Sequence, residues 1–186
     1  MKILTCIAMK EEIGDYSNKI DNLLITGVGK IDATYSLTKE LSKNKYDIVL
    51  NLGSCGAHGK DVYVGDMVYC EDFSTEITGL ESLGIEEKTI YPSIKNLLPH
   101  IQHSSCITVS KFVSETSGYG EYPVVFDMES YALAKVCKLE GIPFVSYKFI
   151  SDKLDMKDWQ SSFLDCSNSL FTIYAAIKDK SSEIYR

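Results

Sequence analysis

Arginine is almost absent from this chain, since the only one among 186 residues is Arg186. The net charge is −7, the pI is about 5.0, and no run of basic residues occurs. A protein that binds nucleic acid through its phosphates needs a positively charged face, so we expect no nucleic-acid partner. Any phosphate site would have to use lysine or backbone N–H groups.

Long hydrophobic runs and signal-peptide features are also missing. A membrane-spanning helix needs about 20 apolar residues, and no run approaches that length. We therefore expect no membrane partner and a soluble, cytoplasmic protein. The six cysteines are scattered, without a C-x-x-C pair, and most lie inside apolar runs, which is typical of buried reduced thiols. They are Cys6, Cys55, Cys70, Cys106, Cys137 and Cys166.

Metal-ligand spacing is present in one place only, at His100 and His103. Pro99 lies next to this pair and no acid is close in sequence, so we interpret both as surface residues and expect no metal site. A chain that is 45% apolar can bury one well-packed core, and we expect a single domain over residues 1–186.

The most informative stretch runs from Val124 to Ile150. Residues 124–126 form a short apolar run that predicts a buried strand, and the residues after Glu129 carry an apolar pattern that predicts a helix. Gly141, followed by Ile142-Pro143, predicts the end of that helix through a left-handed cap. Residues 144–150 then predict a second strand. A strand, a helix and a strand in succession are typical of an α/β fold.

Acidic residues follow both of these strands. Asp127 and Glu129 come after the first strand, and Asp152 comes after the second. If the strands are parallel, these acids meet at one sheet edge, where open α/β folds bind ligands. Each has a simpler interpretation on its own, because Glu129 could complement a helix dipole and Asp152 could cap a helix.

Three earlier segments repeat the pattern of a strand followed by a turn. Residues 3–8 predict a strand and Met9 to Ile13 a helix start, where Glu11 and Glu12 could simply complement the dipole. Residues 23–26 predict a strand that turns through Gly27-Val28-Gly29 into a helix over 31–42. This G-x-G lacks the third glycine of a dinucleotide fingerprint and is weak evidence for a cofactor.

The third of these segments is a strand over 47–52 followed by a loop from Gly53 to Ala57. Its glycines allow a close backbone approach and present Ser54 and consecutive N–H groups to a ligand. The spacing does not fit a nucleophile elbow. The remaining patterns predict four further elements: a bent strand or strand pair over 62–71, a short helix over 92–98, a strand over 107–114 and a closing amphipathic helix over 157–178.

Taken together, the turn motifs resemble one family, the nucleoside phosphorylase/nucleosidase superfamily, and are most similar to its methylthioadenosine/S-adenosylhomocysteine nucleosidases. The resemblance implies a three-layer αβα sandwich around a mixed, largely parallel twisted sheet. It also implies a purine nucleoside as ligand, no cofactor and a homodimer. The motifs occur in family order along nearly the whole chain: Ala8-Met9-Lys10-Glu11-Glu12, Gly27-Val28-Gly29-Lys30, Asn51-Leu52-Gly53-Ser54-Cys55-Gly56, Phe126-Asp127-Met128-Glu129 and Ile150-Ser151-Asp152.

The resemblance also implies roles for individual residues. Glu12 would activate the attacking water, and Asp152, helped by Ser151, would protonate the leaving purine. Met128 and Glu129 would hold the ribose. The other residues expected at the site are Met9, Ser54, Cys55 and Gly56 on the water and ribose side, Phe112 and Val113 at the purine, and Asp127 and Lys148. Cleavage of an N-glycosidic bond needs such an acid and base near an oxocarbenium-like sugar.

Three functions follow as hypotheses. Family phosphorylases hold phosphate with arginines, so the scarcity of arginine favours a hydrolase, although Lys30 or Lys148 could pair with phosphate. A phosphorylase is the second hypothesis. The third is a catalytically silent nucleoside-binding protein, because Lys148 stands where nucleosidases commonly carry arginine and the chain is shortened around residues 73–88. The family uses that region for the dimer contact and the substrate's 5′ end, and Trp159 or Phe163 could replace it as a cover.

Overall fold

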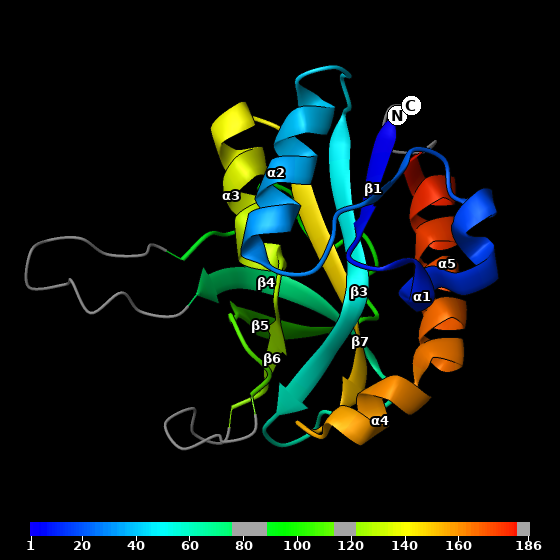
Figure 1. Ribbon diagram of the computed structural model, residues 1–186, viewed down its shortest axis with the longest axis vertical. Helices are drawn as coiled ribbons and strands as arrows, with labels where there is room; N and C mark the ends of the chain where they lie inside the picture. Colours follow the sequence, from blue (N-terminus) through cyan, green and yellow to red (C-terminus); the bar gives the residue numbers. More distant parts are fainter. Residues whose placement is uncertain (76–88, 114–121, 182–186) are drawn as a thin grey trace, which may run out of the picture.

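The computed structural model describes residues 1–75, 89–113 and 122–181. Within them, strands and helices alternate along the chain (Figure 1). The strands are β1 (Ile3–Ile7), β2 (Leu23–Ile25), β3 (Ile48–His58), β4 (Met67–Thr75), β5 (Gln102–Thr108), β6 (Val124–Asp127) and β7 (Phe144–Asp152). The helices are α1 (Lys10–Ile13), the 3-10 helix η1 (Gly14–Lys19), α2 (Lys30–Leu41), α3 (Ser130–Glu140), α4 (Met156–Ser161) and α5 (Phe163–Ser181).

The strands form one mixed sheet in the order β2-β1-β3-β6-β5-β4-β7, and β7 also pairs with β3. This extra pairing closes β3, β6, β5, β4 and β7 into a ring. The pairs β1–β2, β1–β3, β3–β7, β4–β5 and β5–β6 are parallel, whereas β3–β6 and β4–β7 are antiparallel. The sheet is therefore mixed and largely parallel, as predicted.

Helices cover the sheet on both faces, with α2 and α3 on one side and α1 and α5 on the other (Figure 1). Each face has its own apolar core, since Leu37 and Leu133 belong to one buried cluster and Ile13 and Leu170 to the other. Continuous apolar runs such as residues 48–52 fit a sheet that is buried on both faces. The predicted αβα sandwich is confirmed.

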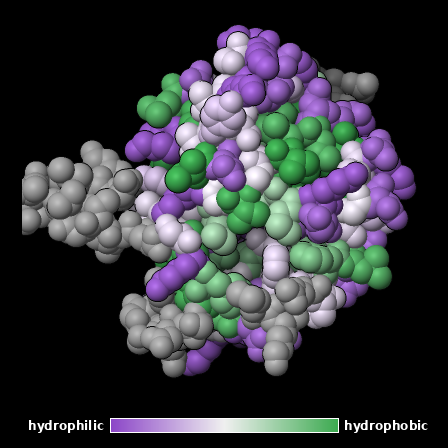
Figure 2. All heavy atoms as spheres, in the orientation of Figure 1, coloured by the Kyte–Doolittle hydropathy of each residue, from purple (hydrophilic) through white to green (hydrophobic). Residues whose placement is uncertain are grey.

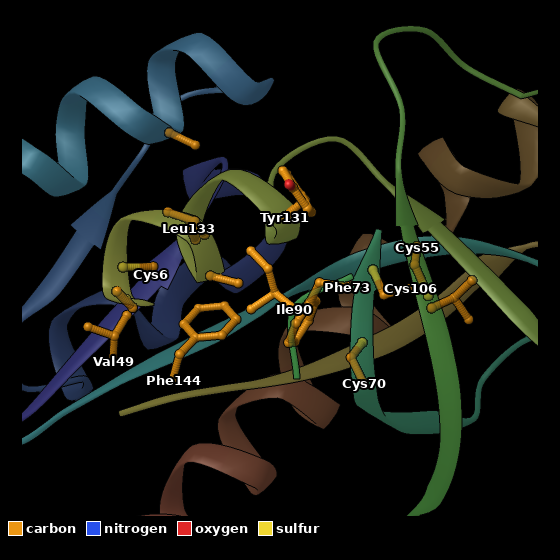
Figure 3. Packing of buried hydrophobic residues seen from close by; sticks show 14 of the residues in the cluster. Cys6, Val49, Cys55, Cys70, Phe73, Ile90, Cys106, Tyr131, Leu133 and Phe144 are labelled. Carbon is orange, nitrogen blue, oxygen red and sulfur yellow. The ribbon is translucent and has the colours of Figure 1, made fainter. Parts of the chain in front are cut away.

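The first core lies between the strands and α3. Phe73 and Phe144 meet edge to face with ring centroids 5.2 Å apart, next to Ile90 (Figure 3). All six cysteines are buried and free, as predicted, and several belong to this cluster. Burial raises the pKa of thiols such as Cys137, to about 12. None of the helices that the structure describes is long and apolar enough to cross a membrane.

Some predicted elements are wrong in extent or direction. The segment Gly53 to Ala57 is not a loop, because β3 continues through it to His58. Strand β6 runs antiparallel to β3 whereas β7 runs parallel to it, so the two acid-bearing strands β6 and β7 are not parallel to each other. Residues 92–98 form no helix. The closing helix is two helices, α4 and α5, which meet at Ser162.

The predicted end of α3 is confirmed. Gly141 adopts the left-handed conformation with φ 69°, and its N–H donates to the Cys137 carbonyl. At the other end of the helix, the Ser130 N–H donates to Asp127 Oδ2 over 2.9 Å. Asp127, the acid that follows the predicted strand, thus stabilises the corner between β6 and α3. This corner brings Asp127 and Glu129 to the carboxyl end of β6.

Candidate active site

A cavity of about 240 Å³ opens where the carboxyl ends of β1, β6 and β7 meet the second half of β3. Eleven of the thirteen predicted site residues line it: Met9, Glu12, Ser54, Cys55, Gly56, Phe112, Val113, Asp127, Met128, Glu129 and Asp152. Lys148 and Ser151 do not line the cavity, but each hydrogen-bonds one of its acids. The continuation of β3 to His58 carries Ser54, Cys55 and Gly56 along the cavity wall.

Glu12 lies on α1, and only 4% of its surface is exposed. Its Oε1 accepts hydrogen bonds from the Ser54 N–H and the Ser54 hydroxyl, each over 2.7 Å. Its Oε2 accepts a hydrogen bond from the Met9 N–H over 3.2 Å. The side chain is therefore fixed by donors from the start of α1 and from β3, and it lines the cavity.

Asp152 ends β7 and is 1% exposed. Its Oδ2 lies 2.7 Å from the Ser151 hydroxyl, and its Oδ1 accepts the Leu154 N–H over 2.8 Å. Burial raises the pKa of Asp152 above its ordinary value, although these hydrogen bonds oppose the shift. A Cβ at Gly56 would lie 3.0 Å from Asp152 Oδ1, so the missing side chain leaves room for this carboxyl group.

Glu129 lies at the start of α3 and is 7% exposed. Its Oε1 accepts a hydrogen bond over 2.7 Å from the N–H of Gly29, the residue that caps the start of α2. Burial, with the charge of Asp127 nearby, raises the pKa of Glu129 to about 7. The hydrogen bond from Gly29 links the β6–α3 corner to α2. An interpretation in which Glu129 only complements the dipole of its own helix does not explain this bond.

Asp127 and Lys148 form a buried ion pair, with 2.8 Å between Asp127 Oδ2 and Lys148 Nζ. The carboxylate also accepts hydrogen bonds from the Thr108 hydroxyl and from Ser130. Burial opposes both charges, but the pairing outweighs it, so the pKa of Asp127 is lowered and that of Lys148 is raised. Loss of one partner would leave a buried unpaired charge, which typically destabilises a protein by about 3–5 kcal/mol.

The opposite wall of the cavity is largely apolar. Phe112 and Val113, which follow β5, line it together with Met128. Sequence reasoning assigned no site role to six lining residues. Three of them stand in the quoted motifs, namely Ala8, Val28 and Phe126, and three belong to no motif, namely Val109, Lys111 and Leu154. Trp159 also lines the cavity, as its suggested role as a cover requires, whereas Phe163 lies behind it with ring centroids 5.1 Å apart.

The histidine pair lies elsewhere. His100 and His103 are exposed, and His103 contacts Glu71 and Asn96 through its two ring nitrogens, each over 3.1 Å. Their interpretation as surface residues agrees with this placement. Across the part of the chain that the structure describes, no three His, Cys, Asp or Glu side chains are grouped to hold a metal ion.

The fold and the cavity define an α/β protein with a small-molecule site at the carboxyl ends of its strands, where buried acids face an apolar wall. A family model described as "Phosphorylase superfamily" matches residues 9–176. The chain therefore belongs to the phosphorylase superfamily, and the family predicted from its motifs is confirmed.

Two relatives within the family share one name. The chain is 28% identical over 163 residues to the 5′-methylthioadenosine/S-adenosylhomocysteine nucleosidase of Bacillus pumilus, covering 75% of this chain and 71% of that protein. It is 26% identical over 157 residues to the Exiguobacterium enzyme of the same name, covering 72% and 67%.

Solved structures agree on the fold. The nucleosidase of that name from Neisseria meningitidis, in complex with methylthio-immucillin-A, has a TM-score of 0.80 at 20% identity and covers 97% of this chain and 100% of that one. The Borrelia burgdorferi structure described as putative and bound to adenine has a TM-score of 0.81 at 19% identity, with 95% and 99% covered.

Proposed function

We propose that this protein hydrolyses the N-glycosidic bond of a purine nucleoside of the methylthioadenosine/S-adenosylhomocysteine type and releases adenine. The observation that carries the proposal is the placement of Glu12 and Asp152 on one cavity in different surroundings. Glu12 accepts hydrogen bonds from three donor groups, whereas burial raises the pKa of Asp152. Glycosidic cleavage uses such a pair, in which one acid keeps its proton while the other accepts one.

In this mechanism Glu12 takes a proton from water as the water attacks the anomeric carbon. Asp152 donates its proton to the purine, which leaves as the neutral base. Ser151, through its contact with Asp152, orients the donating carboxyl group. The charge that builds on the sugar in the oxocarbenium-like transition state is stabilised by the acids around it.

The remaining walls suit the two halves of a nucleoside. Glu129 and Met128 sit together at the β6–α3 corner, where the Glu129 carboxyl group can accept hydrogen bonds from vicinal ribose hydroxyls. Phe112 offers an apolar face for the purine, and the backbone of Val113 offers hydrogen-bonding groups for its edge. Fixed orientation of the sugar and base accounts for a large part of the rate enhancement in such reactions.

Water fits the nucleophile position better than phosphate does. Among the described lining residues, Lys111 is the one cation and Glu12, Asp127, Glu129 and Asp152 are acids. Lys148 is paired with Asp127 behind the wall, and the Lys30 ammonium donates to the Thr75 hydroxyl over 3.1 Å. A phosphorylase remains the second candidate because Lys111 offers one positive charge.

The name shared by the relatives and the matching fold support the nucleosidase, and family resemblance supports a homodimer.

The decisive assay measures free-base release from methylthioadenosine, S-adenosylhomocysteine, adenosine and inosine, with and without phosphate. We expect adenine from the first two without phosphate. Release only in the presence of phosphate, with ribose-1-phosphate type products, would establish a phosphorylase. Nucleoside binding without base release would favour the silent binding protein.

Asp152→Asn tests the acid directly. The amide keeps the shape of the side chain and can still accept the Leu154 N–H, but it cannot supply the carboxyl proton. We expect kcat to fall by about 10²–10⁴-fold, the usual contribution of a general acid. Asp165→Asn, which changes an exposed acid on α5, is the control for lost charge. A fully active Asp152→Asn enzyme would exclude the assigned acid.

A further inference from the structure

Trp159, the only tryptophan of the chain, lies on α4 and lines the cavity. Its indole Nε1 lies 3.1 Å from the Ser54 hydroxyl oxygen, and that oxygen lies 2.7 Å from Glu12 Oε1. Three side chains from α4, β3 and α1 therefore form one hydrogen-bonded line that ends on the carboxylate. Figure 1 shows α4 beside the carboxyl ends of β3 and β7.

The chemistry of the groups fixes the direction of both hydrogen bonds. An indole N–H can only donate, so the Ser54 oxygen accepts from Trp159. The Ser54 hydroxyl has one proton, and Glu12 is the acceptor that faces it. With one lone pair engaged by the indole, the hydroxyl proton is held toward Glu12. Trp159 and Glu12 together thus fix which way the Ser54 hydroxyl points.

The segment that carries Trp159 also begins at the opposite acid. Asp152 Oδ1 accepts the Leu154 N–H at the start of this segment, and Leu154 adopts a positive φ of 69° there. Five residues after Leu154, Trp159 donates to the Ser54 hydroxyl, which contacts Glu12. One short segment therefore contacts Asp152 directly and Glu12 through Ser54, the two acids to which the mechanism assigns proton transfer.

We propose that Trp159 is a positioning residue for Glu12, acting through the Ser54 hydroxyl, so that docking of α4 on the cavity aligns the base with the nucleophilic water. The role of Glu12 as base rests on the proposed function. The hydrogen-bond line itself rests on the geometry alone. A side chain that merely covers the substrate would need its apolar ring and would not need the indole N–H.

The hydrogen bond can be observed without any activity. Because the chain has one tryptophan, its indole N–H gives a single side-chain resonance in a ¹H–¹⁵N correlation spectrum. Ser54→Ala removes the acceptor, so we expect the indole proton to shift upfield and to exchange faster with solvent. An unchanged indole resonance in Ser54→Ala would overturn the proposal.

The positioning role is tested by a double-mutant cycle on kcat with methylthioadenosine. Trp159→Phe keeps an aromatic ring against Phe163 and removes the N–H; we expect kcat to fall about 3- to 10-fold, as for loss of one hydrogen bond, with KM within about twofold. In a Ser54→Ala background the same change should alter kcat by less than about 1.5-fold, because the N–H then has no partner to orient.

Equal losses of kcat from Trp159→Phe in both backgrounds would show that Trp159 does not act through Ser54, and an unchanged kcat in Trp159→Phe would show a covering role; either result would overturn the proposal. Leu164→Ala, at an exposed position of α5, is the control for changes near α4 and should leave kcat and the indole resonance unaltered. If the wild-type protein releases no base while Ser54→Ala still shifts the indole resonance, the proposed function fails. The positioning role of Trp159 then fails with it, although the hydrogen bond is confirmed.

Discussion

Glu129 shows how burial at one residue links the cavity to stability. Its pKa of about 7 in the folded protein compares with 4.5 for an ordinary glutamate. Below pH 4.5 both states carry the proton, so the stability is unaffected. Between pH 4.5 and 7 the unfolded chain loses the proton while the folded protein retains it, so the free energy of unfolding falls as the pH rises.

We therefore expect Glu129→Gln to become more stable than the wild type as the pH rises from 4.5 to 8. The difference should approach a value on the order of 3 kcal/mol, because each pKa unit corresponds to about 1.36 kcal/mol. Urea unfolding at a series of pH values measures it. Glu11→Gln, at an exposed position of α1, is the control for lost charge alone. A difference between Glu129→Gln and wild type that is constant across this range would contradict the prediction.

Residue positions at the cavity were predictable where a motif stands at a strand end. Glu12, Asp127, Glu129 and Asp152 all reach the cavity, as their places in the sequence indicated. The direction of Lys148 was not predictable, because whether a lysine faces a cavity or a buried acid depends on the register of β7 against its neighbours. The contact of Trp159 with Ser54 joins residues 105 positions apart, and no local pattern signals such a contact.

At the scale of elements, β3 determines the shape of the site. Its first half pairs in parallel with β1, and its second half pairs antiparallel with β6, where Gly56 lies opposite Phe126. A register shift between Cys55 and Gly56 interrupts the pairing with β7 at the same point. This long, bent strand explains how Asp127 and Asp152 meet although β6 and β7 run in opposite directions.

Gly56→Ala tests this close approach. The added Cβ would lie 3.0 Å from Asp152 Oδ1 and 2.9 Å from Leu154 Cδ2, so the carboxyl group must move. We expect kcat to fall by about 10-fold or more, since small misplacements of reacting groups are costly, and stability to fall by about 1–3 kcal/mol.

A second variant separates the two contacts. Gly56→Ala combined with Leu154→Ala gives the Cβ room on the leucine side only, so stability should partly recover while kcat stays low. Full recovery of kcat in the double variant would mean that displacement of Leu154, rather than of Asp152, causes the loss.

Element types were predictable from periodicity, but their limits were less so. The glycines within residues 53–57 resemble a loop, yet these residues form strand because β6 and β7 flank them and take up their backbone hydrogen bonds. The single apolar pattern over 157–178 gives no sign of the interruption at Ser162, whose N–H bonds the Trp159 carbonyl instead of continuing a regular helix. At residues 53–57, tertiary pairing overrides local preference.

At the scale of the whole molecule, the helical layers around the ring of strands leave an apolar surface on α2. Ile31 and Tyr35, one turn apart, are 84% and 64% exposed. Val28, which lines the cavity, precedes them in the chain. Figure 2 shows apolar side chains over the end of α2 nearest the cavity, among polar neighbours. Exposed apolar side chains gathered in this way are typical of protein interfaces.

We expect the homodimer that the family resemblance predicts to use this surface. Part of the region shortened relative to the family, residues 76–88, lies outside the described residues, so the prediction concerns α2 alone. Sedimentation equilibrium should give twice the chain mass of 20.8 kDa for the wild type.

Ile31→Glu would bury a charge at the interface and should raise the dimer dissociation constant by about 30-fold or more, as at an interface hot spot. Leu139→Glu, on α3 at a position that is 76% exposed, is the matched control. A monomeric wild type would contradict the dimer, whereas dissociation by Leu139→Glu and not by Ile31→Glu would place the interface on α3.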